Sequence, residues 1–546
     1  MAGLVLLVAA VYWPVLGFDF VRWDDPVNTT GNALLREPWS WSLLVKLFNG
    51  DTALRFEPLT WLLYRGNHAL FGFNPAAWHA LGLGLHLLAV LLFHRVLLEL
   101  LTQLRPLAPD GWRHGAALAG AAIWAVHPAR VEPACWVTAT PYPLLGVFLL
   151  ASFWFYSRAS RQTEAGARRR DFGVAWILAL LGYASYPVGV TYGLWLMVAD
   201  IWIFRTAPDW RAGWDRLLPW CRRQALFLLP AVASILVTWS SSSSTPWLYP
   251  APPSFAEVGL LVRMKTGAAM LTAVGTHFVW PVGLTPNNPM LDPIQQEAPW
   301  LAALSGLALL AIGAVWLLRR RQPGVAGTVF GCTVLSLPVL GLLQWPSWSV
   351  ADRHVYLPHL VLAGAMAIAA VPREPGRRWH LPPALFSGGL ILSLALLSRR
   401  QVMIWRNTDT LFTYIEAQPA FGWNARQQAY LYLLWGAQAQ EQNREQEARR
   451  RFDQARRVLQ EGVIAAALNG SLKTAVEISW QLEAQFGLPP AIRRERGRWL
   501  LQLGRNEEAA AELARTVREA PEDAEAQKLL NEARRSVVAP PVAGGD

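Results

Sequence analysis

The stretch LLGVFLLASFWFYSRASRQTEAGARRR, residues 144–170, joins an apolar run to a strongly basic segment. With its flanks the run reaches the length that a bilayer-spanning helix needs, about 20 residues. Arginines that follow such a run directly mark the cytoplasmic end of a span, because basic loops stay on that side of the membrane. The stretch therefore predicts a transmembrane helix and gives its direction.

The same pattern recurs along the first 400 residues. Further apolar runs occupy residues 301–318 and 360–371, and the 546-residue chain is 53% hydrophobic and only 16% charged. Its mean hydropathy of +0.23 is too high for an ordinary soluble protein of this length. The formal net charge is +11, but the arginines gather at helix ends, so we expect no nucleic-acid partner. The predicted fold class is all-α, a polytopic bundle of membrane helices.

Basic segments also predict the topology. If residues 158–172, 205–223, 319–323 and 373–380 face the cytoplasm, about eleven spans result, and this odd number places the two ends of the bundle on opposite sides. If residues 261–284 crossed the membrane, the arginines at 319–321 would lie outside the cytoplasm. We therefore expect residues 261–284 to form a re-entrant or interfacial helix. The predicted spans are residues 2–18, 78–100, 114–128, 141–157, 173–186, 188–204, 224–240, 299–318, 325–343, 357–372 and 381–398.

This topology brings charged residues from distant parts of the chain to one outer face. The outer segments are residues 19–77, 127–136, 241–298 and 344–358. They carry the carboxylates Asp24, Asp25, Glu132 and Asp352 and the guanidinium of Arg353. Charged groups that face one another at a membrane edge predict a functional site, although each one alone could simply cap a helix or hydrate a loop.

Beyond residue 400 the composition becomes polar and rich in Ala, Glu and Arg, which is typical of water-soluble helices. Gly470 and Gly504 are 34 residues apart, and so are Ala475 and Ala509. This is the period of tetratricopeptide repeats (TPRs), in which small residues let the two helices of a hairpin approach closely.

Other small residues support about three degenerate repeats. The last unit contains Gly497 and Pro521 at repeat positions, and an earlier one has Gly436, Ala448, Phe452 and Ala455, with Asn443 where a glycine is usual. We therefore predict a membrane domain over residues 1–400, a connector over 401–423, a TPR domain over 424–535 with a capping helix at 523–535, and a disordered tail over 536–546. A TPR groove would bind a protein acceptor or partner.

Taken together, the motifs resemble the transmembrane-and-TPR-repeat protein family, whose animal members are protein O-mannosyltransferases of the GT-C type. The resemblance covers nearly the whole chain and lies in the order and spacing of several motifs. These are FVRWDDPV (20–27), EPLTWLLYRGNHALFGFNPAAWHALGLGLH (57–86), WAVHPARVEPACWV (124–137), LPVLGLLQWPSWSVADRHVYLPHLVLA (337–363) and QVMIWRNTDTLF (401–412).

The resemblance implies a GT-C glycosyltransferase, which moves a sugar from a polyprenyl-phosphate carrier in the membrane lipid to an acceptor outside the cytoplasm. A carboxylate must take the proton of the acceptor hydroxyl, and a cation must stabilise the leaving phosphate. On this resemblance Asp25, in preference to Asp24, is the general base, and Glu132 orients the acceptor or supports the base. Direct displacement would invert the anomeric centre.

The resemblance also implies a site for the donor phosphate. Arg353 would bind the phosphate, because its planar donors match that oxyanion, while Asp352 fixes the arginine and Tyr356 lines the site. Arg263 and Lys265 are either further phosphate ligands or ordinary cations whose apolar stems lie along the membrane.

The chain departs from the family pattern at several positions near the expected phosphate. It has TATPYPLL (138–145) where relatives usually have a basic residue followed by Asp, Phe56-Glu57 where they tend to have Tyr-Arg, and Tyr186 where a lysine often occurs. Each change removes or reverses a charge. These losses favour an alternative, a non-catalytic membrane scaffold whose TPR domain docks a partner complex. A transporter is a third possibility, but the spans lack the internal repeat of such proteins.

We expect no resident cofactor, and no metal site is indicated, although a divalent ion would be compatible with the chemistry. Three histidines, His79, His86 and His94, recur on one helical face, but no carboxylate or cysteine accompanies them at ligand spacing, so packing is the expected role. The resemblance implies a bacterial inner-membrane protein, and the odd number of spans would then place its TPR domain in the periplasm.

Overall fold

The computed structural model describes residues 1–49, 56–208, 213–243, 259–286, 321–342, 351–372, 383–418 and 425–538, with single residues and short pieces between 313 and 319. The chain divides into two compact units, Met1–Gln418 and Pro419–Asp546. Within the described residues every regular element is helical, which confirms the all-α class.

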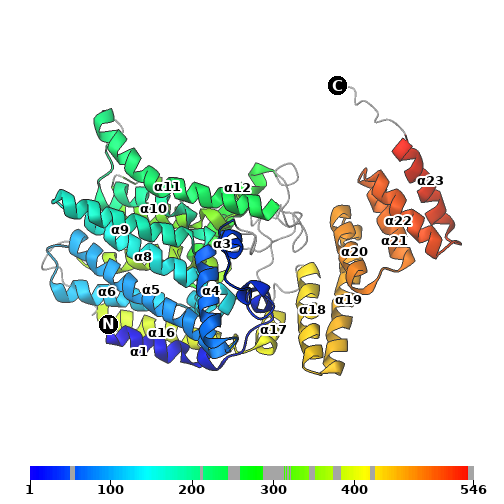
Figure 1. The fold of residues 1–546 in the computed structure, drawn as a ribbon, viewed down its shortest axis with the longest axis horizontal. Helices are drawn as coiled ribbons and strands as arrows, with labels where there is room; N and C mark the ends of the chain where they lie inside the picture. Colours follow the sequence, from blue (N-terminus) through cyan, green and yellow to red (C-terminus); the bar gives the residue numbers. More distant parts are fainter. Residues whose placement is uncertain are drawn as a thin grey trace. The chain divides into compact units, whose positions relative to one another are not determined.

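The first unit is a bundle of helices that run back and forth side by side (Figure 1). Among the residues that the structure describes, four segments are long and apolar enough to cross a membrane: Pro75–Leu104, Val137–Ala159, Pro187–Phe204 and Trp214–Thr238. The chain is therefore an integral membrane protein. The bundle helices are α1 (Ala2–Tyr12), α5 (Pro75–Leu104), α6 (Asp110–Ala125), α8 (Pro141–Ala159), α9 (Ala165–Tyr183), α10 (Tyr192–Ala199), α11 (Trp214–Ser243), α12 (Leu260–Val279), α14 (Pro323–Ser336), α15 (Pro358–Ala369) and α16 (Pro383–Met403).

These helices lie where the spans were predicted. The predicted spans at 78–100, 141–157 and 224–240 fall inside α5, α8 and α11, and the span at 299–318 falls almost entirely outside the described residues. Residues 260–279 form α12, a helix of 20 residues that is not among those apolar enough to cross a membrane. The number of spans thus remains a prediction, and so does the re-entrant or interfacial placement of residues 261–284.

Local sequence explains where several helices begin. Proline occupies the first position of α5, α8 and α15, where its missing N–H would have no partner in any case. The side chain of Asn74 caps α5 by accepting a hydrogen bond from the Ala76 N–H at 3.1 Å.

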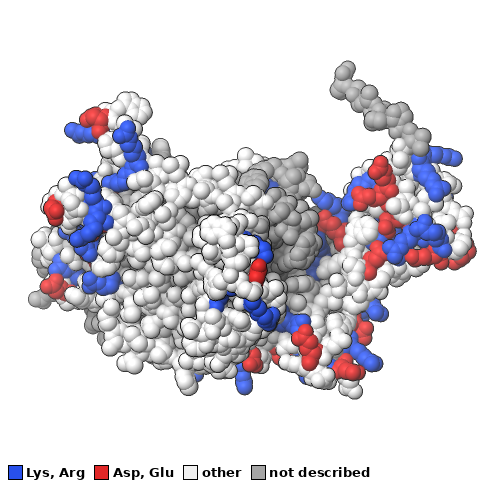
Figure 2. All heavy atoms as spheres, in the orientation of Figure 1, with Lys and Arg blue, Asp and Glu red and all other residues white. Residues whose placement is uncertain are grey.

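Short helices gather at one end of the bundle, where α5, α8 and α15 begin and α6 and α9 end. At the opposite end, around the α8–α9 turn and the start of α11, Lys and Arg cluster on the surface (Figure 2). We call these the site end and the basic end. The site-end elements are α2 (Asp25–Asn28), α3 (Trp41–Phe48), α4 (Pro58–Phe71), η3 (Pro128–Arg130), α7 (Val131–Cys135), η4 (Val137–Ala139), η9 (Asp352–Val355) and α17 (Thr408–Glu416).

The boundary between the units falls inside the predicted connector, residues 401–423. The helix α17 belongs to the first unit, where Trp23 and Phe412 meet edge to face with ring centroids 6.0 Å apart. The Arg22 N–H also donates to Thr408 Oγ1 at 2.9 Å. Residues 401–418 are therefore part of the membrane unit.

The second unit is a row of helices in which each packs on the next (Figure 1). Its elements are α18 (Ala425–Glu441), α19 (Glu445–Leu468), α20 (Leu472–Phe486), α21 (Pro490–Gln502), α22 (Asn506–Glu519) and α23 (Ala524–Val538). The predicted disordered tail begins at 536, but α23 continues to Val538, and residues beyond it lie outside the described part of the chain.

One turn geometry recurs three times in this unit. Asn443, Gly470 and Gly504 have φ values of 58°, 75° and 73°, a left-handed conformation that favours Gly and, among other residues, Asn. After each turn the next N–H bonds back across the helix end, as in Arg505 to the Leu500 carbonyl at 2.9 Å. A buried alanine follows each turn residue by five positions: Ala448, Ala475 and Ala509.

The predicted repeat positions are also closely packed. A Cβ added to Gly436 would lie 2.8 Å from the Phe452 ring, and one added to Gly497 would lie 2.5 Å from Leu513. The helical hairpins therefore need glycine there, as the repeat pattern predicts. The assignment of this unit to the TPR class remains a prediction.

Candidate functional site

The centre of the candidate site is the segment from His127 to Thr140, which connects α6 to α8 at the site end. Every residue of the segment is buried except Thr138, which is half-buried. His127 begins it by accepting a hydrogen bond from the Ala129 N–H on Nδ1 at 3.2 Å, and Pro128 follows at the first helical position. This segment, which we call the central segment, contacts three others that are remote in sequence.

The first contact is with Asp25, whose carboxylate is buried against the central segment. Its Oδ1 accepts hydrogen bonds from the Thr138 N–H at 3.1 Å and the Thr138 hydroxyl at 2.7 Å. Its Oδ2 accepts one from the Val21 N–H at 2.9 Å. Burial raises the pKa of Asp25 to about 7, although these three donors oppose the shift. The carboxyl group thus titrates near neutral pH, which suits a general base.

The second contact is an ion pair between Glu132 on α7 and Arg353 on η9. The Arg353 guanidinium donates a hydrogen bond to Glu132 Oε1, and the backbone N–H of Arg353 donates to Glu132 Oε2 at 3.1 Å. Burial alone would lower the pKa of Arg353, but the charge of Glu132 outweighs burial and holds that pKa above its usual value. The guanidinium also lies 5.3 Å from the centroid of the Trp136 ring, a cation–π distance.

Asp352, beside Arg353, faces α12. Its Oδ1 lies 3.7 Å from His277 Nδ1, and neither atom has a hydrogen-bond partner among the described residues. Burial raises the pKa of Asp352 well above its ordinary value, and the charge of Glu132 adds to the shift. Burial therefore favours the neutral acid. Among the described residues the ion-pair partner of Arg353 is Glu132, not Asp352.

The third contact is with the C-terminal turns of α12, through two histidines. His127 Nε2 lies 3.1 Å from the Phe278 carbonyl, and His359 Nε2 lies 2.9 Å from the Val274 carbonyl. Because the Nδ1 atoms of both rings accept, from the Ala129 N–H and from the Arg130 guanidinium at 3.0 Å, each Nε2 must carry the proton. Two neutral imidazoles thus fasten α12 to the site; we call them the histidine clasp.

Arg130 links the clasp to the bundle interior. The buried guanidinium donates to the Val355 carbonyl at 3.2 Å and lies 5.2 Å from the centroid of the Tyr356 ring. Burial lowers the pKa of Arg130 to about 10, which leaves the group charged at neutral pH. Tyr356 itself points inward, where its hydroxyl lies 3.0 Å from His86 Nδ1. His86 therefore has the packing and hydrogen-bonding role expected for it.

The remaining candidate residues lie around this centre. Asp24 is half-buried at the start of α2, directly before Asp25. Arg263 is buried on α12 with Nη1 3.5 Å from the Gly341 carbonyl, and Lys265 is half-buried two residues on. The structure thus brings together Asp25, Glu132, Asp352 and Arg353 through the central segment. The roles assigned to these residues remain predictions.

The positions that depart from the family pattern also lie at the site. Thr138 holds Asp25, and the Tyr186 ring lies 4.8 Å from that of Tyr142, centroid to centroid. Both tyrosines are near enough to Arg353 to interact with its charge. Hydroxyl groups therefore lie near Asp25 and Arg353 at these positions.

Several residues of the site carry no distinctive sequence signal. Arg130 and His127 fall inside the quoted motif WAVHPARVEPACWV, but nothing in the motif links them to His359 or to α12. Trp405 stacks on Trp136 with ring centroids 5.6 Å apart, although the two residues are far apart in the sequence. Within the described part of the chain, no three His, Cys, Asp or Glu side chains cluster in a way that could hold a metal ion.

Comparison with known proteins supports the resemblance. The chain is 27% identical to human "Protein O-mannosyl-transferase TMTC2" over 266 residues, and 26% identical to the mouse protein over 265 residues. Each match covers 45% of this chain and 29% of the relative, so the chain spans less than a third of the curated relatives.

Among solved structures, ArnT from Cupriavidus metallidurans, determined bound to undecaprenyl phosphate and in the apo state, aligns with 14% identity. The alignment covers 92% of this chain and 80% of ArnT, with a TM-score of 0.36. No family profile matches the chain. The chain is an integral membrane protein distantly homologous to the TMTC2 O-mannosyl-transferases, as its motifs predict.

Proposed function

We propose that this protein is a GT-C-type glycosyltransferase that moves a mannose-like sugar from a polyprenyl-phosphate carrier to a protein or glycan acceptor. The observation that carries the proposal is the convergence of Asp25, Glu132 and Arg353 on the central segment. The distant homology to O-mannosyl-transferases supports the same class of reaction.

In this proposal Asp25 takes the proton from the acceptor hydroxyl as that oxygen attacks the anomeric carbon. A pKa near 7 balances the fraction of ionised carboxylate against its strength as a base at neutral pH. Among the described residues Oδ2 accepts one hydrogen bond and Oδ1 accepts two, so Oδ2 is the oxygen with more capacity to take the proton. Attack opposite the leaving phosphate inverts the anomeric centre.

Arg353 would bind the donor phosphate with the N–H groups that Glu132 does not use, since a guanidinium has five. Glu132 then positions the guanidinium, or the acceptor that approaches it. Tyr356 would line the interior side of the site beside Arg130, and Asp352 would contribute next to Arg353 without a direct ion pair. Arg263 and Lys265 on α12 are candidates for further phosphate contacts.

We further propose that the basic end faces the cytoplasm of a bacterium and the site end the periplasm. The donor lipid would then reach the site from the outer leaflet of the inner membrane. The second unit, as a periplasmic TPR domain, would bind the acceptor protein or a partner.

The test is sugar transfer by the purified full-length protein in liposomes. The donor is polyprenyl-phosphate mannose labelled in the sugar, and the acceptor is membrane protein from a strain that lacks this gene. Removing a general base costs about 10²- to 10⁴-fold in rate, so Asp25→Asn should reduce transfer by that amount. Val27→Ala, at an exposed position two residues away, is the matched control. Unchanged transfer by Asp25→Asn would refute the proposal.

One set of contacts favours a second function, a membrane scaffold without catalysis. Both oxygens of Asp25 are engaged by structural donors, and Glu132 already neutralises Arg353. A scaffold would be indifferent to Asp25→Asn in a pull-down of its partner, provided the variant folds, but would lose that partner when residues 424–535 are deleted.

A further inference from the structure

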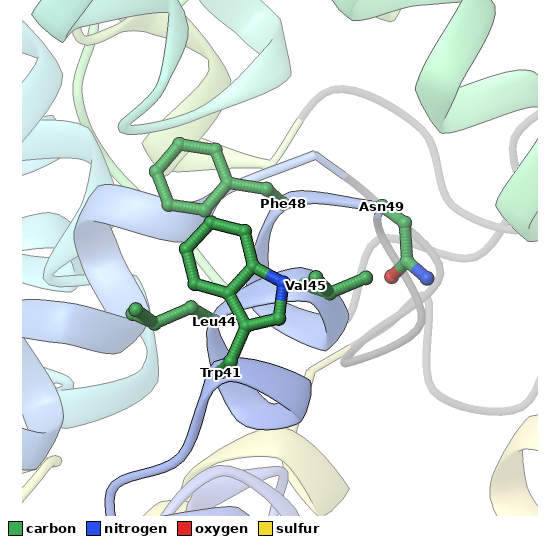
Figure 3. A pocket seen from close by; sticks show the side chains of 5 residues that line it. All are labelled: Trp41, Leu44, Val45, Phe48 and Asn49. Atoms are coloured by element: carbon green, nitrogen blue, oxygen red, sulfur yellow. The ribbon is translucent and has the colours of Figure 1, made fainter.

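The helix α3, between the first span and α4, has two apolar faces. Leu43 and Leu47 point inward and are fully buried against Trp61, Tyr64 and Trp78. On the opposite face Trp41, Val45 and Phe48 recur at helical spacing and are 79%, 46% and 52% exposed. Their side chains, with Leu44 and Asn49, line a hollow of about 420 Å³ (Figure 3).

This outward face lies close to the point where a membrane span begins. The helix α3 packs on α4, and Leu70 and Phe71 at the end of α4 are 76% and 55% exposed. The chain then turns directly into α5, which begins at Pro75 and is long and apolar enough to cross a membrane. Trp78, on the first turn of α5, packs in the same cluster as Leu43 and Leu47, so α3 lies beside the start of this span.

The polar residues of α3 lie at its ends and edges. Ser40 caps the helix by accepting a hydrogen bond from the Leu43 N–H at 3.1 Å, and Lys46 pairs with Glu37 at 2.9 Å. Tryptophan at the membrane–water boundary, with an apolar helix face and a flanking lysine, is the pattern of a helix that lies in the plane of the interface. A water-exposed face would instead leave Trp39 and Trp41 in solvent.

We propose that α3 is an interfacial helix whose outward face, Trp41, Val45 and Phe48, inserts among the acyl chains of bilayer phospholipid. Lys46 stays at headgroup level, beside Glu37. The inward face of α3 packs against the same core as Val137, which precedes the Thr138 that holds Asp25. Anchoring α3 in the leaflet therefore positions the central segment at the membrane surface.

Spin labels at two neighbouring positions test the proposal. In a Cys221→Ser background, which removes the exposed native cysteine, Val45→Cys and Lys46→Cys are labelled one at a time with a nitroxide. The two residues are matched controls, because Val45 is 46% exposed and the Lys46 side chain 47% exposed. The full-length protein is placed in nanodiscs of phosphatidylethanolamine and phosphatidylglycerol that contain no polyprenyl lipid.

Power saturation then compares collisions with oxygen, which concentrates in hydrocarbon, and with a water-soluble nickel chelate. We expect an oxygen-to-nickel accessibility ratio several-fold higher at position 45 than at position 46. Equal ratios at the two positions would overturn the proposal, and so would a label at position 45 that neither reagent reaches, since a protein surface would then cover the face. The readout needs no sugar transfer, so it is independent of the proposed function.

Discussion

Two opposing effects act on the pKa of the Asp25 carboxylate. It is fully removed from solvent, which penalises its charge, and it is surrounded by three donors, which favour that charge. Burial is the larger effect, so the pKa moves from 3.8 to about 7. The adjacent Asp24 is only half-buried, so the two aspartates of the motif have different environments.

This shift makes stability depend on pH. A carboxyl group with a raised pKa binds a proton more tightly in the folded state, so its contribution is present below about pH 4 and is lost as pH rises through 7, at most about 4 kcal/mol. We expect the melting temperature of the wild type to fall more between pH 5 and 8 than that of Asp25→Asn, measured by thermal unfolding in detergent. Thr138→Val keeps the titrating carboxyl group, so its melting temperature should still depend on pH. If the melting temperatures of the wild type and Asp25→Asn fell equally between pH 5 and 8, Asp25 would not be the group responsible.

Glu132 and Arg353 form a buried pair, and removal of one partner leaves the other charge unpaired. We expect Glu132→Gln and Arg353→Gln each to destabilise the protein by about 3–5 kcal/mol, and the double variant to be less destabilised than the sum. Thermal unfolding of the four proteins measures this coupling. Additive effects would show that the pair contributes no interaction energy.

At the scale of elements, the site depends on how α12 is attached. Its last turns are held by the histidine clasp, His127 and His359, rather than by sequence neighbours. Both imidazoles of the clasp are neutral in this arrangement, because each Nδ1 accepts a hydrogen bond while each Nε2 donates one. Protonation would turn each Nδ1 into a donor that faces another donor, so we expect acid to weaken the contact.

Loss of one clasp histidine should loosen α12 locally. We expect His359→Ala to speed hydrogen exchange of the backbone amides in the last two turns of α12, because the Val274 carbonyl and the Arg130 guanidinium each lose a partner. Mass spectrometry of peptides covering Thr272–Val279 measures the change, with α18–α23 as an internal reference. His114→Ala, an exposed position at the basic end, should leave α12 unchanged. Unaltered exchange in His359→Ala would mean that α12 is held by its apolar contacts alone.

At the scale of the whole molecule, basic side chains on the surface of the bundle are concentrated at one end. Lys and Arg gather at the basic end (Figure 2), whereas buried charges of both signs occur at the two ends, such as Asp171 and Asp200 at the basic end and Arg130 at the site end. Because basic loops remain in the cytoplasm, the basic surface predicts the orientation of the protein in the membrane.

The native Cys221 and an introduced cysteine at Val27 report the two ends, since both positions are exposed. A membrane-impermeant maleimide added to spheroplasts should label Val27→Cys, tested in a Cys221→Ser background, but not Cys221 in the wild type. Inverted vesicles should reverse the result. Labelling of both positions from the same side would refute the proposed orientation.

Sequence by itself determined the all-α class, the positions of most bundle helices and the homology to O-mannosyl-transferases. These follow from local signals, because hydropathy, helix-start prolines and basic flanks act over a few turns of chain. The topology also predicted that Asp25, Glu132, Asp352 and Arg353 would lie on one face. In the structure Asp25 and Arg353 contact the central segment through Thr138 and Glu132, whereas Asp352 faces His277 on α12.

Only the tertiary structure decided which partner each charge has. The pairing of Glu132 with Arg353, the separate position of Asp352, the inward direction of Tyr356 and the clasp on α12 join residues far apart in sequence. A polar group that is removed from water must find whatever donor or acceptor the packing brings within hydrogen-bond distance. That choice depends on the geometry of neighbouring helices, which no local pattern of residues encodes.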